Sequence, residues 1–227
     1  MAADRTTGEQ WGDIAGEWIR KLNGEKDPHR DGLLDPWVLD AIGEVAGLRV
    51  IDLGCGEGRF GRVLAERDAD VVGIDFTPLF VEYANAHAVG SERYLVGDMA
   101  DLSEFPDESF DLAVSYVSLV DVPDFLPVVR EAYRVLRPAG RFVVSNLQPM
   151  VTAANGWLKD ERRNKLHFRL DNYFDEGGAR EMPMCGGVVT NFHHTLSCYV
   201  NGFLAAGFRL DGIREPKPSD EQLTRFP

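Results

Sequence analysis

The chain of 227 residues is long enough for one domain that buries a core without disulfides. Its net charge of −13 disfavours nucleic acid and anionic membranes as partners, because both present negative charge. The 3 cysteines lack paired spacing, so we expect neither a disulfide framework nor a metal site. The sequence shows no bilayer-spanning apolar run and no signal-peptide segment, and we therefore expect a cytoplasmic protein.

Two helical patterns come first along the chain. Apolar residues at helical spacing run from Trp11 to Leu22 and again from Leu34 to Val45. The polar residues 23–32 between them predict a loop. Residues 1–47 are therefore expected to form an N-terminal helical segment.

Residues 48–146 alternate between strand and helix patterns. Helices are predicted from Phe60, from Pro78 behind a Thr77 N-cap, and from Phe125 to Leu136. Such alternation indicates an α/β domain with a Rossmann-like, doubly wound and mostly parallel sheet. The predicted strands are 49–54, 70–75, 93–98, 110–117 and 140–146.

The regularity ends after the fifth predicted strand. Residues 147–190 mix aromatic, charged, proline and glycine residues, and we interpret them as an inserted substrate cap. A strand at 188–195, a helix at 197–206 and a last strand at 208–215 are expected to follow. The simplest organisation is one domain over 1–227, with residues 48–146 as the cofactor-binding core and 191–227 as a strand–helix–strand segment.

The stretch "VIDLGCGEGRFG" at 50–61 has four glycines directly after a buried-strand pattern. One glycine at a strand–helix junction is typical of a turn. Several there favour the close approach of a ligand, because glycine leaves the backbone accessible and admits positive φ. In a parallel sheet that position lies at the carboxyl edge, beside the start of a helix, where such folds bind ligands.

The spacing of these glycines narrows the class of ligand. The third one, Gly58, comes one residue earlier than in the dinucleotide fingerprint, and Glu57 places a carboxylate inside the loop. Asp75 nevertheless ends the second predicted strand, about 20 residues on, where an acid holds ribose hydroxyls. The pattern therefore favours a nucleoside without a strongly anionic phosphate group.

Several further motifs follow the glycine loop in a specific order. They are Asp75 after "VVGI", "VGDMADLSEFPDESFDLAVS" and "EAYRVLRPAGRFVVS". Together with "VIDLGCGEGRF" they resemble the class I S-adenosylmethionine-dependent methyltransferases over residues 48–146. The resemblance is strongest to the small-molecule branch that includes quinone-biosynthesis enzymes, the methyltransferase type 11 family. It implies the class I methyltransferase fold, S-adenosyl-L-methionine as cofactor, and methyl transfer to oxygen, nitrogen or carbon.

The resemblance also implies roles for individual residues. Asp75 matches the acid that binds ribose, and Asp98 with Met99 matches the segment that binds adenine. Phe76 would border the adenine. Apart from the resemblance, Arg30 in the polar loop between the N-terminal helices is a candidate for contact with the carboxylate of the cofactor, with a surface position as the alternative. The full cofactor site expected is Asp52, Gly54, Cys55, Gly56, Gly58, Asp75, Phe76, Asp98, Met99, Ser115, Tyr116, Trp18 and Arg30.

Methyl transfer is an in-line displacement, so the protein must align the acceptor, exclude water and, where needed, remove a proton. His193 and His194 are the candidate proton acceptors, because histidine titrates near neutrality. In a strand they face opposite sides, so only one is expected to reach the cleft. Apolar and aromatic candidates for the acceptor pocket or the cap's own core are Trp18, Trp37, Trp157, Phe168, Tyr173, Phe174, Met182 and Met184.

Two alternatives remain open from the sequence. A relative of the same fold could bind the cofactor and act as a regulator or catalyse another reaction, such as cyclisation. A nicotinamide-dependent oxidoreductase is disfavoured by the position of Gly58 and by Glu57. The acidic composition favours a small-molecule acceptor for the methyl group.

Overall fold

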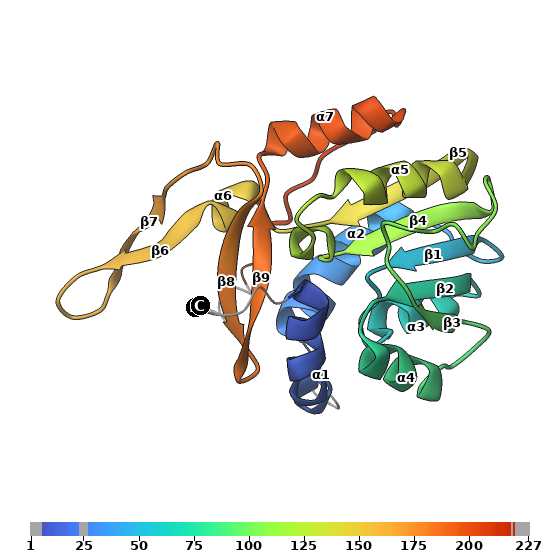
Figure 1. Ribbon diagram of the computed structural model, residues 1–227, viewed down its shortest axis with the longest axis horizontal. Helices are drawn as coiled ribbons and strands as arrows, with labels where there is room; N and C mark the ends of the chain where they lie inside the picture. The colour runs from blue at the N-terminus through green and yellow to red at the C-terminus, as the bar shows by residue number, and fades with distance from the viewer. Residues whose placement is uncertain (1–5, 23–26, 219, 221–227) are drawn as a thin grey trace.

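The computed structural model describes residues 6–22, 27–218 and 220. At its centre lies a five-stranded, all-parallel sheet in the order β3-β2-β1-β4-β5 (Figure 1). Central strand β1 is buried from residue 50 to residue 53, as expected for a strand covered on both faces, and this burial includes Asp52. This arrangement confirms the expected α/β fold. The strands are β1 (Arg49–Leu53), β2 (Asp70–Asp75), β3 (Arg93–Val96), β4 (Phe110–Tyr116) and β5 (Leu136–Ser145).

Helices cover both faces of the sheet, and the alternation of β1 side chains divides the core between them. Ile51 and Leu53 point to the face that packs under α5 and α7. Val50 points to the other face, under α2 and α3, so Asp52 lies on that side too. The helices are α2 (Asp35–Ile42), α3 (Arg59–Ala65), α4 (Pro78–Ala86), α5 (Leu126–Val135) and α7 (Leu196–Ala206), with a short 3₁₀ turn, η2 (Leu119–Asp121), after β4.

The N-terminal segment is more helical than its sequence predicts. Helix α1 (Thr7–Leu22) lies beside α4, and a π-helix, η1 (Pro28–Leu34), leads directly into α2. The expected loop over 23–32 is therefore wrong from residue 28 onward, whereas residues 23–26 lie outside the described part of the chain. Local polar contacts stabilise the turn, since the Asp27 carboxylate accepts from the backbone and the guanidinium of Arg30.

The cap consists of regular hairpins, which corrects the expectation of an irregular segment. A short helix, α6 (Pro149–Thr152), precedes one antiparallel hairpin of β6 (Ala154–Lys159) and β7 (Lys165–Leu170). A second hairpin joins β8 (Gly178–Met184) to β9 (Gly187–His193), which is the strand expected at 188–195. Strand β9 packs on α1, where the backbone N–H of Thr190 donates to the side chain of Gln10 at 2.8 Å.

Helix α7 matches the helix expected at 197–206. The Thr195 hydroxyl caps it by accepting from the N–H of Cys198 at 3.0 Å, and Gly207 ends it with a φ of 106°. The strand expected at 208–215 is wrong, because this segment pairs with no strand of the described chain and residues 209–215 are exposed. Within the described residues, no helix combines the length and apolar character that crossing a bilayer requires.

Candidate functional site

The glycine loop joins β1 to α3 at the carboxyl edge of the sheet. Gly54, Gly56 and Gly58 all have left-handed backbones, with φ of 76°, 55° and 79°. A residue with a Cβ is strained in this region, so the turn itself requires glycine at all three positions. The backbone conformation therefore accounts for part of the glycine run without any ligand.

The three glycines differ in what surrounds them. A Cβ on Gly54 would lie 2.4 Å from the Cβ of Ser118, and one on Gly58 would lie 2.7 Å from that of Ala84. A Cβ on Gly56 would meet no atom of the described residues within 4 Å. Gly54 and Gly58 are thus packed by the protein itself. The space at Gly56 is open, and this is where a ligand can approach the backbone.

Asp75, at the end of β2, holds the glycine loop in place. One carboxylate oxygen accepts from the N–H of Gly56 at 2.9 Å, and the other accepts from the N–H of Thr77 at 2.8 Å. Burial raises the pKa of the Asp75 carboxyl, and these two hydrogen bonds oppose the rise. Each carboxylate oxygen can accept more than one hydrogen bond, so Asp75 keeps acceptor capacity toward the open space at Gly56.

Asp52 is the least satisfied polar residue of the site. Its side chain is buried, and neither oxygen has a hydrogen-bond partner among the described residues. Burial, together with repulsion from Asp75, raises the pKa of Asp52 to about 7. A buried carboxyl without a partner is costly, so a cation or hydrogen-bond donor bound beside it would be stabilised.

Trp18 and Arg30 bring the N-terminal helices onto the glycine loop. The indole N–H of Trp18 donates to Glu57 at 3.2 Å, and Nη1 of Arg30 lies 3.4 Å from the other oxygen of the same carboxylate. The guanidinium of Arg30 also stacks over the Trp18 ring. Its Nη2 atom is buried and has no partner in the part of the chain described. Glu57, which places a carboxylate inside the glycine loop, therefore holds the guanidinium of Arg30 beside that loop.

A second ion-pair network fixes α2 against the start of α3. Arg59 makes a bidentate contact with the Asp35 carboxylate at 2.7 and 2.9 Å and a further bond to Asp31 at 3.0 Å. The Tyr116 hydroxyl donates to the same Asp35 at 2.7 Å. Burial and this carboxylate raise the pKa of Tyr116 well above its usual value. The hydroxyl of Tyr116, one of the expected cofactor residues, is therefore already engaged by Asp35.

The remaining expected cofactor residues divide into two groups. Met99 is buried beside Gly54, and Asp98 is exposed with one oxygen accepting from the N–H of Ala100 at 2.8 Å. Phe76 is half-buried against α1. Two others serve the protein's own packing: the Ser115 hydroxyl bonds that of Ser118 at 2.7 Å, and Cys55 packs among Val81, Ala84 and Tyr94.

Asp121 is a site residue that the sequence did not reveal. It lies in η2, just beyond the carboxyl end of β4, and accepts from the Asn191 side chain of β9 at 2.6 Å. Burial raises the pKa of Asp121 to about 7, and the Asp75 charge adds to the rise. Asp121 thereby joins the core to the cap.

The two candidate histidines have different surroundings. His193 bonds the Thr152 hydroxyl through Nδ1 and the backbone oxygen of Tyr173 through Nε2, both at 2.7 Å. His194 is also buried, but neither ring nitrogen has a hydrogen-bond partner among the residues described. Its Nδ1 lies 3.4 Å from a carboxylate oxygen of Glu176, and its ring packs against Phe125. The hydrogen bonds of His193 therefore hold parts of the cap together. The ring nitrogens of His194 are not engaged in such bonds.

The aromatic and methionine candidates do not form one pocket. Trp18 lies at the glycine loop, whereas Trp157 and Phe168 pair on the β6–β7 hairpin and Phe174 is 86% exposed. The other members are Tyr173, next to His193, together with Trp37, Met182 and Met184, which are half-buried or exposed.

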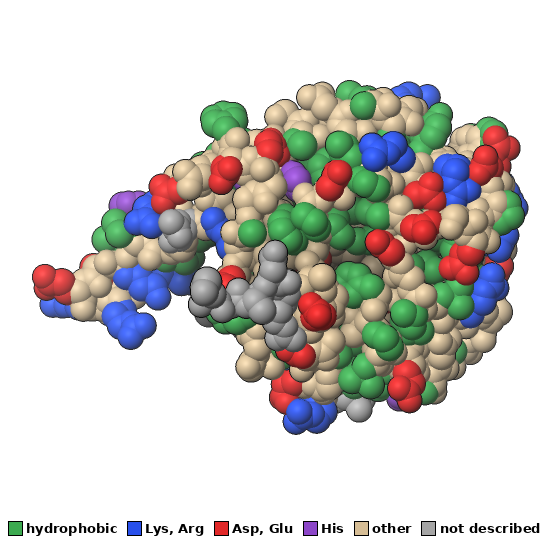
Figure 2. Space-filling view, in the orientation of Figure 1, with side chains coloured by type: hydrophobic (Ala, Val, Ile, Leu, Met, Phe, Trp, Pro, Cys, Tyr) green, Lys and Arg blue, Asp and Glu red, His purple; other side chains and the backbone are tan. Residues whose placement is uncertain are grey.

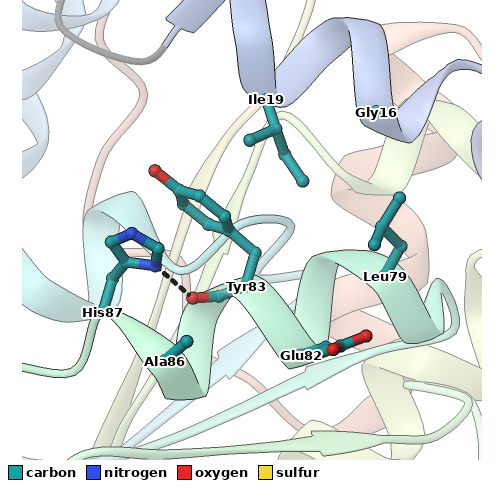
Figure 3. Close-up of a pocket in the computed structure, with 7 residues that line it drawn as sticks. All are labelled: Gly16, Ile19, Leu79, Glu82, Tyr83, Ala86 and His87. Carbon is teal, nitrogen blue, oxygen red and sulfur yellow. Dashed lines mark hydrogen bonds between the residues drawn. The ribbon is translucent and has the colours of Figure 1, made fainter.

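A separate groove opens between α1 and α4 (Figure 3). Tyr83 and His87 stack along one side of it, with ring centroids 3.8 Å apart. The groove shares none of its lining residues with the glycine loop or the acidic residues described above. It is lined by Gly16, Ile19, Leu79, Glu82, Tyr83, Ala86 and His87.

Comparison with known proteins places the chain in a family. Residues 51–144 match the model of a methyltransferase domain. An uncharacterized methyltransferase of Bacillus subtilis, YbaJ, is 31% identical over 212 residues, which cover 89% of this chain and 78% of that protein. A ubiquinone biosynthesis O-methyltransferase of Xanthomonas oryzae is 32% identical over 140 residues, covering 59% of this chain and 57% of that enzyme.

Solved structures of methyltransferases resemble this chain as well. An S-adenosylmethionine-dependent methyltransferase from Mesorhizobium loti superimposes with a TM-score of 0.73 at 31% identity, covering 84% of this chain and 88% of that one. A related structure from Listeria monocytogenes gives a TM-score of 0.74 at 27% identity, covering 84% and 91%. The chain belongs to the class I S-adenosylmethionine-dependent methyltransferases.

Proposed function

We propose that this class I S-adenosylmethionine-dependent methyltransferase methylates a small molecule that binds between the glycine loop and the cap. One observation carries the proposal: two groups of opposite charge have buried atoms without hydrogen-bond partners among the described residues, namely both oxygens of the Asp52 carboxylate and Nη2 of Arg30. Glu57 adjoins both, because it bonds Arg30 and its charge raises the pKa of Asp52. An amino-acid zwitterion would satisfy the two groups at once.

Under this proposal, separate residues of the site would each bind one group of S-adenosylmethionine. Asp52 would hold its amino group, Arg30 its carboxylate and Asp75 its ribose hydroxyls. Asp98 would accept from the adenine amine. The open space at Gly56 admits the chain of the ligand close to the backbone. When bound, the cofactor supplies a methyl group on a cationic sulfur with a neutral thioether as leaving group.

The acidic residues around the glycine loop suit a cationic ligand. Asp52, Glu57 and Asp75 are buried at the carboxyl edge of the sheet or in the loop that follows it, and Asp121 in η2 is half-buried. A positive charge placed among them lowers their mutual repulsion, and the pKa of Asp52 falls as a result. A pyrophosphate would add to that repulsion, which is the physical reason that a dinucleotide does not fit here.

We propose His194 as the group that removes a proton from the acceptor. Glu176 lies beside Nδ1 and would orient the ring, which leaves Nε2 to accept a proton. His193 cannot take this role without breaking its bonds to Thr152 and Tyr173. An acceptor hydroxyl would suit this arrangement, and the similarity to a ubiquinone biosynthesis O-methyltransferase supports methylation at oxygen.

The experiment is a turnover assay that measures S-adenosylhomocysteine released with a panel of phenolic, amine and carbon acceptors. We expect release that depends on a phenolic acceptor. His194→Gln should lower kcat roughly 100-fold at neutral pH. His167→Gln, on the exposed hairpin, is the matched control and should leave kcat unchanged.

Two outcomes would refute parts of the proposal separately. Cofactor binding without release of S-adenosylhomocysteine across the panel would favour a non-methylating relative of the fold. Release at the wild-type kcat in His194→Gln would leave methyl transfer intact and remove the histidine from the chemistry.

A further inference from the structure

Three side chains with different metal-binding atoms meet where β9 leads into α7. They are Glu176 before β8, His194 directly after β9, and Cys198 in the first turn of α7. One ligand atom from each of the three lies within 4.8 Å of the other two. Figure 2 shows histidine and acidic side chains next to each other over this end of α7. The cluster thus combines a carboxylate oxygen, an imidazole nitrogen and a thiol sulfur.

The imidazole of His194 is the member of this cluster that needs a partner. Its side chain is only 8% exposed, and neither ring nitrogen has a hydrogen-bond partner among the described residues. The rings of Phe125 and Tyr199 pack against it, with centroids 5.0 and 5.6 Å away. A buried polar group without a hydrogen bond is costly. A ligand bound at Nδ1, on the side of Glu176, would remove that cost.

The distance between His194 and Glu176 suits a shared metal ion. Nδ1 lies 3.4 Å from Oε2, whereas a charge-assisted hydrogen bond typically spans about 2.7–2.9 Å. Bonds of about 2.0–2.1 Å to a tetrahedral Zn²⁺ ion place two such ligand atoms about 3.4 Å apart. The corresponding distance to a thiolate sulfur is about 3.6 Å. A rotation of the partly exposed Cys198 side chain would close the gap that remains to its sulfur.

Thr195 holds the carboxylate and the start of α7 in position. Its hydroxyl donates to Oε1 of Glu176 at 2.5 Å and accepts from the N–H of Cys198 at 3.0 Å. Its backbone N–H donates to both oxygens of Glu176, at 3.2 and 3.3 Å. Because each carboxylate oxygen accepts more than one bond, Oε2 keeps a lone pair for a metal. Outer partners of this kind orient the ligands of metal sites.

We propose that Glu176, His194 and Cys198 form a binding site for Zn²⁺. Zinc takes oxygen, nitrogen and sulfur ligands, whereas Mg²⁺ and Ca²⁺ prefer oxygen alone. A carboxylate, a thiolate and a neutral imidazole carry two negative charges, which balance the charge of the ion. A hydrogen bond joins the Cys198 thiol to the Glu176 carboxylate, and zinc takes the place of its proton, which leaves to solvent. The unpaired spacing of the cysteines does not bear on a mixed ligand set.

Zinc at this site would also act on methyl transfer, a consequence that rests on the proposed role of His194. An imidazole that binds a metal through Nδ1 carries its proton on Nε2. Nε2 is then a donor and no longer accepts a proton from the acceptor. Bound zinc is therefore expected to lower turnover at least ~10-fold, and a chelator should restore it.

The test is metal binding to the full chain after treatment with a chelator. Calorimetry should give a single Zn²⁺ per chain, and Co²⁺ in its place should give a thiolate-to-cobalt charge-transfer band. Cys198→Ser should abolish the band and weaken Zn²⁺ binding at least ~100-fold, and His194→Gln should weaken it similarly. Cys185→Ser is the matched control. Cys185 is also a free and partly buried cysteine, but it lies between β8 and β9, outside the cluster, so this variant should keep both signals.

Circular dichroism and binding of S-adenosylhomocysteine identify folded variants, because unfolding abolishes both signals. A wild type without the charge-transfer band overturns the proposal, as does equal loss of the band in the two cysteine variants. Zinc that binds His194→Gln and Cys198→Ser as tightly as the wild type is held elsewhere, which also overturns it. Failure of the proposed function gives a different result: zinc bound with turnover unchanged would remove His194 from the chemistry and leave the metal site intact.

Discussion

The glycine-loop half and the cap half of this methyltransferase leave different groups unsatisfied. In the loop half, charged atoms lie buried without partners, namely the Asp52 carboxylate and Nη2 of Arg30. In the cap half, His193 has both ring nitrogens bonded, the buried ring nitrogens of His194 have no hydrogen-bond partner among the described residues, and apolar side chains such as Phe174 are exposed. The first half calls for a small charged ligand. The second calls for apolar contacts with an acceptor or with another protein surface.

Of these two kinds of unsatisfied group, the buried charge gives the more direct evidence about the ligand. An unpartnered buried charge is costly and identifies the chemistry of what would satisfy it. An exposed apolar side chain can pack against many different molecules, so it indicates a binding surface but does not identify the ligand. The cofactor is therefore specified by a few atoms, whereas the acceptor must be found by assay.

The largest expected effect is on stability, and it distinguishes a glycine that is packed against the protein from one that faces open space. Gly54→Ala should cost about 3 kcal/mol of unfolding free energy, because a Cβ there overlaps Ser118 and the backbone is left-handed. Gly56→Ala should cost only about 1 kcal/mol, since its Cβ enters open space. Denaturant unfolding of the ligand-free variants measures both values.

Cofactor affinity completes that comparison. The folded Gly56→Ala variant should bind S-adenosylmethionine more than tenfold more weakly, because the new methyl group occupies the ligand's path. Wild-type affinity in Gly56→Ala would mean that the open space is not where the ligand lies, and the glycine run would be a turn only.

The next effect concerns the buried charge. Asp52→Asn keeps the shape of the side chain and removes its charge, so S-adenosylmethionine should bind about 30-fold more weakly, by about 2 kcal/mol. The ligand-free variant should also be more stable than the wild type above pH 7, because it no longer buries an ionised carboxylate. Calorimetric titration and thermal unfolding measure the two changes, which should have opposite signs.

The pH dependence follows from the pKa of about 7 at Asp52. A ligand that needs the ionised carboxylate should bind about tenfold more weakly at pH 6 than at pH 8, with little change at higher pH. The raised pKa also means that the ligand-free protein loses stability as pH rises from the unfolded value of 3.8 to about 7. In Asp52→Asn the affinity should no longer vary over this range, and a persistent tenfold change would point to another group.

The smallest effect tests whether the cap acts independently of the loop. Thr152→Val removes the hydroxyl that bonds Nδ1 of His193 and should cost about 1–2 kcal/mol of stability. Cofactor affinity should stay at the wild-type value in a calorimetric titration. A parallel loss of cofactor binding would show that the two halves are coupled.

The core of the fold could be predicted because its signals are local. Five apolar runs, each followed by a helical pattern or a turn, specify the sheet, and the glycine loop with Asp75 specifies the nucleoside site. The networks that complete the site are not local. Asp35 is paired with Arg59 and with Tyr116, which follow it by 24 and 81 residues, and Asp121 meets Asn191 70 residues later. No spacing rule connects such residues.

The errors in the cap and at the C-terminal end have physical reasons as well. The segment 208–215 carries a strand-like pattern, but a strand also needs a neighbour, and none is present in the described chain. Strand β8 was missed because Pro183 and charged residues interrupt its alternation. Strand β7 does carry a strict alternation of polar and apolar residues, but the irregular residues on either side of it hide this short strand pattern.

The most direct test of the account compares two ligands that differ only in the amino-acid part. S-adenosylhomocysteine carries it and 5′-methylthioadenosine lacks it, so calorimetry of the wild type should give much tighter binding of the former. The double variant Asp52→Asn, Arg30→Gln should abolish this difference and leave the affinity for 5′-methylthioadenosine unchanged. A difference that survives in the double variant, or equal weakening of both ligands, would contradict the assignment of the two unpartnered charges to the amino-acid group.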